Sequence, residues 1–186
     1  MNTRIVATLA GATLLLTTSS AWALDAWRDR RGLYYGATVG AGSGQLKLKE
    51  EIPGAEDLEG ELGLNVRLRV GGGATKNLTL DAELGLWSGL DDDPLKPTAG
   101  ITTGFIGANV FVADGFYLRG FGGLTYMSLD DADADAETGL GVGFGAGYEF
   151  FANSDLAVGV GADYQMHFYD DYEFNLFNLG VSLNYY

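Results

Sequence analysis

The feature that most constrains this chain is a two-residue alternation between apolar side chains and small or polar ones, which recurs along most of its length. The stretch from Leu78 to Leu86 is typical, because every second residue in it is apolar. Alternate residues of a β-strand point to opposite faces, so the pattern predicts strands that each have one apolar face. Eight such segments are predicted, at residues 33–41, 62–70, 78–86, 100–112, 116–126, 140–150, 156–166 and 177–185.

The fourth segment fits this pattern less well than the others. Its apolar residues fall into two sets that are out of phase with each other. The apolar face is assigned to Ile106, Ala108, Val110 and Val112, and the opposite phase holds Ile101, Phe105 and Phe111. A β-bulge within the segment could reconcile the two sets.

The connections between the segments alternate in length. Those at 43–60, 89–98, 129–138 and 169–173 are long, and those at 71–76, 113–115 and 151–155 are short. In an up-and-down barrel every second connection emerges at the same end, so all the long connections share one end. Most of the 25 acidic residues and all three prolines fall in the long connections. Long outer loops opposite short turns are typical of outer-membrane barrels.

The residues between the apolar ones indicate which face is turned outward. In the sixth segment they are Gly141, Gly143, Gly145, Gly147 and Glu149. A soluble secreted barrel would turn this bare face to water, and the lumen of eight strands could not hold all the apolar side chains. The sequence therefore predicts an all-β fold, an eight-stranded antiparallel up-and-down transmembrane β-barrel. The inward glycines leave room for larger side chains such as Phe121 or Tyr34.

The first residues have the features of a signal peptide. Arg4 provides a positive start, residues 5–16 are apolar, and Ala21 to Ala23 form a small-residue cleavage site. We therefore expect a signal peptide at 1–23 and a barrel domain at 24–186. The chain has no cysteine, which excludes disulfides and thiolate metal sites. Its formal net charge of −14 disfavours nucleic acid as a partner.

The last segment, "NLFNLGVSLNYY", ends in two aromatic residues. Tyr185 is in phase with the apolar Leu183, whereas Tyr186 falls in the opposite phase. With the signal peptide and the eight alternating segments, this chain resembles the small outer-membrane β-barrel family of the OmpA/OmpX type. The resemblance implies the outer membrane of a Gram-negative bacterium, with outer-membrane lipid and lipopolysaccharide as partners. It also implies that the barrel assembly machinery reads the C-terminal strand, here with its aromatic signal shifted by one residue.

Charged residues occupy the face that we expect to line the lumen. They are Arg67, Arg69, Asp81, Glu83, Arg119, Glu149 and Asp163. A buried charge is costly unless it is paired, so these side chains are expected to form a lumen charge network. Arg119 and Glu149 are equidistant from residue 134 and are expected to be cross-strand neighbours.

The hairpin formed by segments 62–70 and 78–86 has two candidate registers. In the first, Arg69 faces Asp81 and Arg67 faces Glu83. A slip by two residues places Arg67 opposite Asp81 instead. In either register the charges lie on the face opposite the leucines and valines.

Three functions fit these features. The favoured one is a non-enzymatic outer-membrane protein, acting as a membrane scaffold or through acidic extracellular loops, with a lumen plugged by salt bridges. The alternative is a narrow channel or transport barrel for ions or small apolar molecules. A lipid-modifying enzyme is disfavoured, because His167 is the only histidine, has no serine close in sequence and is expected at the rim.

No cofactor, metal or catalytic residue is assigned from the sequence. The acidic run from Asp130 to Glu137, "DDADADAE", lacks the glycine and the final glutamate of an EF-hand loop. The acidic loops are expected at most to bind divalent cations weakly, for example by bridging to lipopolysaccharide phosphates.

Overall fold

The computed structural model describes residues 30–49, 58–90, 99–113, 115–129 and 136–186. The predicted signal peptide at 1–23 and most of the acidic residues of the long loops lie outside these described residues. Among the described residues, no helix is long and apolar enough to cross a membrane.

The described chain forms one closed barrel of eight antiparallel strands. In chain order they are β1 (Gly32–Leu48), β2 (Leu58–Gly73), β3 (Leu78–Gly89), β4 (Ala99–Ala113), β5 (Phe116–Leu129), β6 (Glu137–Phe151), β7 (Leu156–Phe168) and β8 (Tyr172–Tyr185). Each strand pairs with the next, and β8 pairs with β1 to close the sheet. The predicted fold class is confirmed, and most strands extend beyond the predicted segments.

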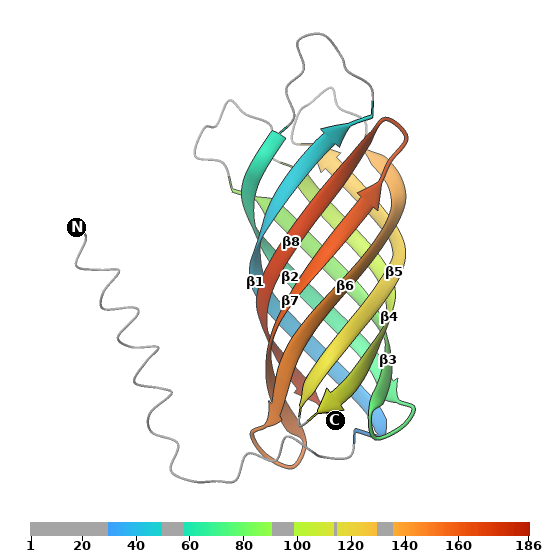
Figure 1. The fold of residues 1–186 in the computed structure, drawn as a ribbon, viewed down its shortest axis with the longest axis vertical. Helices are drawn as coiled ribbons and strands as arrows, with labels where there is room; N and C mark the ends of the chain where they lie inside the picture. The colour runs from blue at the N-terminus through green and yellow to red at the C-terminus, as the bar shows by residue number, and fades with distance from the viewer. Residues whose placement is uncertain (1–29, 50–57, 91–98, 114, 130–135) are drawn as a thin grey trace, which may run out of the picture.

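The two ends of the barrel differ in their connections (Figure 1). The C-terminus and the short turns, which include those at 74–77 and 152–155, lie together at the lower end in this view. The connection between β7 and β8 was expected to be long, but only Tyr169, Asp170 and Asp171 separate these strands. The described strand ends that border the other three long connections lie at the upper end with it.

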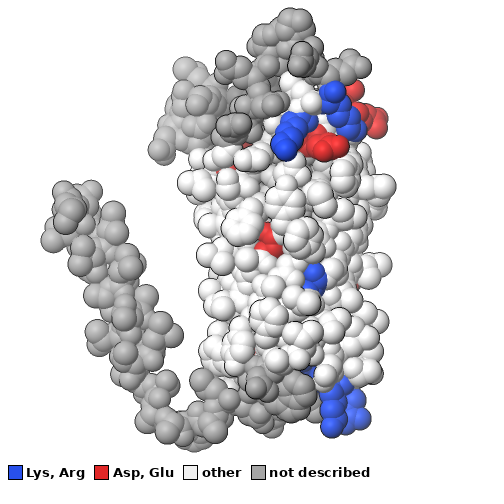
Figure 2. All heavy atoms as spheres, viewed as in Figure 1, with Lys and Arg blue, Asp and Glu red and all other residues white. Residues whose placement is uncertain are grey.

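The outer wall of the barrel is apolar, as the alternation predicts. Leucines, valines and aromatic residues are exposed on every strand, with Ile106 of β4 the most exposed of the large hydrophobic side chains. Figure 2 shows a wall almost free of charged side chains, with charges gathered at the two ends. Such a surface fits lipid, not water.

The irregular fourth segment has a simple explanation. Ile101, Phe105 and Phe111 are buried inside the barrel, while Ile106 and Val110 face outward, as assigned. An irregularity does occur in the pairing of β4 with β5, but it lies between Phe111 and Ala113, beyond all the out-of-phase residues. The prediction that a bulge reconciles the two apolar sets is therefore wrong. β4 carries apolar side chains on both faces, because part of the lumen is itself apolar.

The inward glycines of β6 make room for large side chains of neighbouring strands. A Cβ atom at Gly143 would collide with the ring of Phe121. The expectation for Phe121 is thus confirmed, whereas Tyr34 packs beside Gly71 of β2 and not beside the β6 glycines.

Candidate functional site

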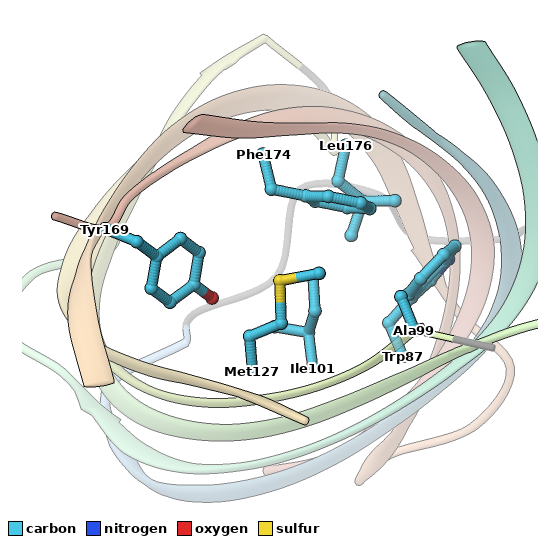
Figure 3. Close-up of a cluster of buried hydrophobic side chains, with 7 residues drawn as sticks. All are labelled: Trp87, Ala99, Ile101, Met127, Tyr169, Phe174 and Leu176. Carbon is cyan, nitrogen blue, oxygen red and sulfur yellow. The ribbon is translucent and has the colours of Figure 1, made fainter. Parts of the chain in front are cut away.

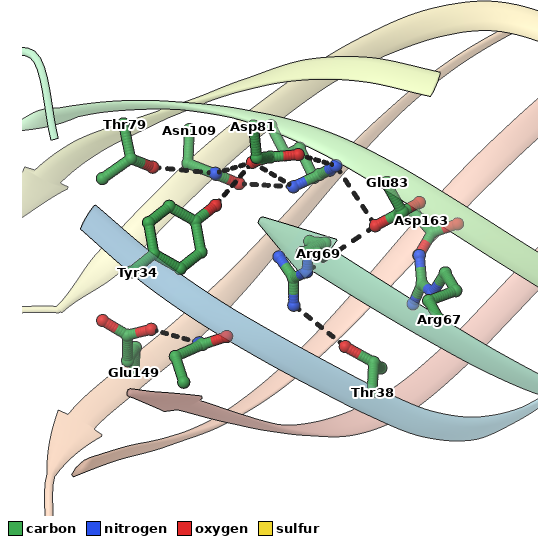
Figure 4. A network of polar contacts seen from close by, with 12 residues as sticks. Tyr34, Thr38, Arg67, Arg69, Thr79, Asp81, Glu83, Asn109, Glu149 and Asp163 are labelled. Atoms are coloured by element: carbon green, nitrogen blue, oxygen red, sulfur yellow. Dashed lines mark hydrogen bonds and ion pairs between the residues drawn. The ribbon is translucent and has the colours of Figure 1, made fainter. Parts of the chain in front are cut away.

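The lumen is the candidate functional site, and its middle layer is a network of ion pairs (Figure 4). The Asp81 carboxylate accepts two hydrogen bonds from Arg119, from Nη2 at 2.7 Å and from Nη1 at 3.0 Å. It also accepts one from the Tyr34 hydroxyl at 2.7 Å and one from Asn109 Nδ2 at 2.9 Å. Arg119 Nη2 lies 3.2 Å from Glu83 Oε2 as well. One carboxylate thus joins side chains of β1, β3, β4 and β5.

The register of the β2–β3 hairpin differs from both predicted registers. Arg69 is opposite Glu83, and Gly71 is opposite Asp81. Arg69 Nε lies 3.6 Å from Glu83 Oε2. The first predicted register is centred on residue 75 and the second on residue 74, whereas the ladder is centred on residue 76. A shift of the centre by one residue moves every partner by two positions.

Arg67 pairs across the lumen and not along the hairpin. Its Nη1 lies 2.6 Å from Oδ2 of Asp163 on β7. Asn178 Nδ2 and Gln165 Nε2 donate to the other oxygen of this carboxylate, at 3.1 Å and 2.8 Å. In a barrel this narrow, long side chains reach across the lumen, so strand neighbours need not be ion-pair partners.

The predicted pairing of Arg119 with Glu149 is also wrong. Arg119 is opposite Gly145, and Glu149 is opposite Gly159 on its other neighbour, β7. The β5–β6 ladder is centred on residue 132 and not on 134, since Met127 pairs with Glu137. Glu149 therefore lies nearer the end of the barrel where the chain terminates, and it has a different cationic partner.

That partner is Arg30, which the sequence analysis did not identify. Arg30 Nε lies 2.9 Å from Glu149 Oε1, and its guanidinium stacks 3.7 Å from the ring centroid of Phe111. Asn184 Nδ2 and the Tyr186 hydroxyl also donate to Glu149, at 2.6 Å and 3.0 Å. The first described residue and the last residue of the chain thus meet on one buried carboxylate. The predicted lumen charges comprise three arginines and four acids. This excess of one acid could have pointed to a further basic residue, which is Arg30.

The opposite end of the lumen is filled by an apolar cluster (Figure 3). Its buried members are Trp87, Ala99, Ile101, Met127, Tyr169, Phe174 and Leu176. The structure shows that they turn inward and pack together, so we call this set the apolar cap.

His167 lies beside the apolar cap and is fully buried, not at the rim as expected. Its Nδ1 is 3.0 Å from Thr125 Oγ1, which is 2.9 Å from the Tyr169 hydroxyl. Phe105 and Phe174 flank the imidazole, each with its ring centroid 6.2 Å away. Burial raises the pKa of Tyr169 to about 12, so this hydroxyl remains protonated at neutral pH.

Small cavities lie along the described part of the lumen. One of about 20 Å³ is lined by Arg67, Arg69 and Arg119. Another of about 10 Å³ lies between Arg67 and the apolar cap, and a third of about 10 Å³ lies between Arg69 and Tyr186. Each has room for only one or two water molecules. Within the described residues, no group of three or more histidine or acidic side chains is placed to hold a metal ion.

The fold and this lumen define a small outer-membrane barrel, and comparison with known proteins agrees. The family described as the outer membrane protein beta-barrel domain matches residues 10–184, so the chain belongs to it. It is therefore a protein of the outer membrane of Gram-negative bacteria. A comparison with curated proteins gave no match.

Solved structures with the same fold include two small surface proteins. Neisserial surface protein A superimposes with a TM-score of 0.66 at 13% identity, covering 83% of this chain and 99% of that one. Ail, the attachment invasion locus protein of Yersinia pestis, superimposes with a TM-score of 0.56 at 14% identity, covering 82% and 98%. At such low identity these similarities establish the fold alone.

Proposed function

We propose that this protein is a closed, non-enzymatic barrel that serves as a membrane scaffold and acts through its acidic extracellular end. The observation that carries the proposal is that the lumen contains three successive closures. These are the apolar cap, the ion-pair network around Asp81 and Asp163, and the cluster of Arg30 and Tyr186 on Glu149. An ion would have to cross all three.

The energetics of the charged layers favour a closed state. In the described lumen, ion pairs join four arginines, Arg30, Arg67, Arg69 and Arg119, to four acids, Asp81, Glu83, Glu149 and Asp163. Breaking a buried ion pair by removing one partner typically costs about 3–5 kcal/mol. A permeating ion competes for the same partners, so several such costs oppose its passage.

The apolar cap opposes permeation for a different reason. Apart from the Tyr169 hydroxyl, which is hydrogen-bonded to Thr125, and the Trp87 indole N–H, its side chains offer an ion no ligands to replace its hydration shell. Hydrophobic constrictions in pores close by excluding water. Trp87 and Phe174 are in contact here, with ring centroids 5.4 Å apart. The cap therefore disfavours both ions and water at this end of the lumen.

The position of His167 supports a role without catalysis. An imidazole that acts as general base must reach the proton it removes, directly or through one water molecule. His167 is fully buried, with Nδ1 bonded to Thr125 and aromatic rings on both sides. It is therefore shielded from a lipid substrate outside the barrel.

The rim beside the cap carries the acidic residues available for contact with partners. Glu137, Asp170, Asp171 and Glu173 are placed there by β6, β8 and the connection between β7 and β8. Glu137 accepts a hydrogen bond from the Asp170 backbone N–H at 2.7 Å, and Lys49 donates to the backbone oxygens of Tyr169 and Asp170. These contacts hold the short connection in place and leave its carboxylates directed outward.

Solute flux through the barrel tests the proposal against the transport alternative. Liposomes that contain the refolded protein are placed in hyperosmotic arabinose or potassium chloride, and their reswelling is followed by light scattering. We expect rates equal to those of protein-free liposomes for both solutes. Reswelling that increases with protein content would contradict the proposal and support the transport alternative.

Mass spectra of lipid A incubated with and without the protein test whether the protein is a lipid-modifying enzyme. No change in the lipid A masses is expected.

A further inference from the structure

The middle of the lumen has a surplus of hydrogen-bond donors around a cavity. The guanidinium groups of Arg67, Arg69 and Arg119 line the cavity of about 20 Å³. Their side chains are 9%, 8% and 5% exposed. Within the described part of the chain, Nε of each of the three has no hydrogen-bond partner, and that of Arg69 has only the ion pair with Glu83 Oε2 at 3.6 Å. Buried donors are normally satisfied, so three of them on one cavity point to an acceptor that binds there.

The remaining lining groups reinforce this surplus. Tyr117 and Ser182 line the same cavity, and the hydroxyl of each can donate a hydrogen bond. Thr38 also lines it, and its oxygen already accepts from Arg69 Nη2 at 2.9 Å, which leaves its own hydroxyl proton available. Asp163 is the one carboxylate in the lining, and it is occupied by Arg67 at 2.6 Å.

The charges are balanced over the whole lumen but not around this cavity. Asp81 and Glu83, which neutralise two of the arginines, do not line it. Glu149 and its partner Arg30 lie at the end where the chain terminates. The lining itself therefore combines three guanidinium groups with one carboxylate, and this surplus of hydrogen-bond donors favours an anion over a cation.

Glycines on three adjacent strands make the cavity possible. Gly145, Gly161 and Gly180 contribute backbone and no side chain to its wall. A Cβ atom at Gly161 would lie 2.9 Å from the Tyr117 hydroxyl, and one at Gly145 would lie 2.6 Å from the Ala162 carbonyl oxygen. Figure 2 shows charged atoms at mid-height through the wall on the side where β6, β7 and β8 are in front. The glycine-rich wall thus leaves the charged centre thinly covered.

We infer that this cavity is a binding site for a small monovalent anion of about the size of chloride. Arg67, Arg69 and Arg119 provide the charge, and the Tyr117 and Ser182 hydroxyls complete a donor-rich shell. A divalent oxyanion would be too large for the volume. The site is independent of whether the barrel conducts, because an anion held in this way is a structural ligand.

Bromide provides a direct probe, since it resembles chloride and scatters anomalously. The protein is refolded and crystallised in sodium bromide, so that the anion can enter while the barrel closes. We expect an anomalous peak in the cavity, at hydrogen-bonding distance from the guanidinium groups. Density for water alone, with no anomalous signal, would overturn the inference.

Thermal stability in solution provides the second readout. The protein is refolded at one ionic strength in mixtures of sodium bromide and sodium gluconate, because gluconate is too large for the cavity. We expect the melting temperature to rise by about 2–4 °C as bromide replaces gluconate, and then to reach a plateau. An equal melting temperature in both salts would count against the site.

Variants of the lining separate binding from a general salt effect. Tyr117→Phe and Ser182→Ala each remove one donor, and at least half of the bromide-dependent shift should be lost in both. Thr103→Ala is the matched control, since Thr103 is a buried hydroxyl of the lumen that does not line this cavity. The control should keep the full shift. If all three variants keep it, or if all three lose it, the anion does not bind where we infer.

Discussion

Asp81 is the residue on which most of the lumen network depends. It accepts hydrogen bonds from Arg119, Tyr34 and Asn109, and it is only 4% exposed. Its identity as a lumen charge follows from the alternation, because it lies between Leu80 and Ala82. Its partners do not follow, because they come from three other strands and depend on side-chain reach.

Replacing Asp81 with asparagine should strongly destabilise the barrel. Asp81→Asn leaves Arg119 buried with Glu83 as its remaining carboxylate, and loss of one partner of a buried pair costs about 3–5 kcal/mol. Urea unfolding in detergent, followed by tryptophan fluorescence, measures the free energy of unfolding. Asp171→Asn, an exposed acid of the β7–β8 connection, is the control and should change it little. Equal effects of the two variants would show that the network contributes no stability.

Substitutions of the two terminal tyrosines should have very different effects on the stability of the barrel, although the two residues are neighbours in the sequence. The Tyr186 hydroxyl donates to Glu149 and its ring stacks on Tyr34, with centroids 5.2 Å apart, whereas Tyr185 faces outward. A hydrogen bond to a charged group contributes about 1.5–3 kcal/mol, so Tyr186→Phe should destabilise the folded barrel by roughly that amount. Tyr185→Phe should leave equilibrium unfolding almost unchanged. The opposite ranking in urea titrations would contradict the inward position of Tyr186.

At the scale of the strands, the sequence predicted the outward faces well and the inner contacts poorly. Ile106 and Val110 were assigned correctly from alternation alone, because contact with lipid depends on one strand's own pattern. The pairings of Arg67 and Arg119 depended on where a turn is centred, and a shift of one residue moves a partner by two positions. Arg30 was missed because it precedes the first alternating residue.

Glycines on opposite faces of the strands should respond differently to added side chains. A Cβ atom at Gly143 meets the Phe121 ring, whereas one at Gly104 on the outer face meets nothing within 4 Å. Gly143→Ala should therefore destabilise the barrel by about 1–3 kcal/mol through overpacking. Gly104→Ala should be neutral, or stabilising by up to about 1 kcal/mol. Unfolding free energies compare the two, and a neutral Gly143→Ala would show that the lumen is looser than described.

The whole molecule separates its charges into balanced pairs inside and an excess of acids at one rim. The acids of the rim and loops give the chain much of its net charge of −14, and repulsion among them opposes their close approach. A divalent cation relieves this repulsion by binding more than one carboxylate. The expected binding is weak, because among the described residues no preformed group of metal ligands exists.

Calcium should therefore raise the stability of the intact barrel modestly. In lipopolysaccharide-containing micelles, millimolar calcium gluconate should increase the melting temperature, and sodium gluconate at the same ionic strength should not. The variant Asp170→Asn with Asp171→Asn should reduce the increase. If millimolar calcium left the melting temperature of the wild-type protein unchanged, divalent bridging would no longer be part of the proposed role.

Closure of the lumen is the central claim, and single-channel recording in planar bilayers tests it most directly. In the closed barrel that we propose, the apolar cap, the Asp81 and Asp163 ion pairs and the Glu149 cluster would each oppose the passage of an ion, so purified wild-type protein should produce no large, stable conductance. The recording should stay at the baseline of the protein-free bilayer, with insertion verified by a labelled sample. Steady openings on the nanosiemens scale from the wild-type protein would contradict this account.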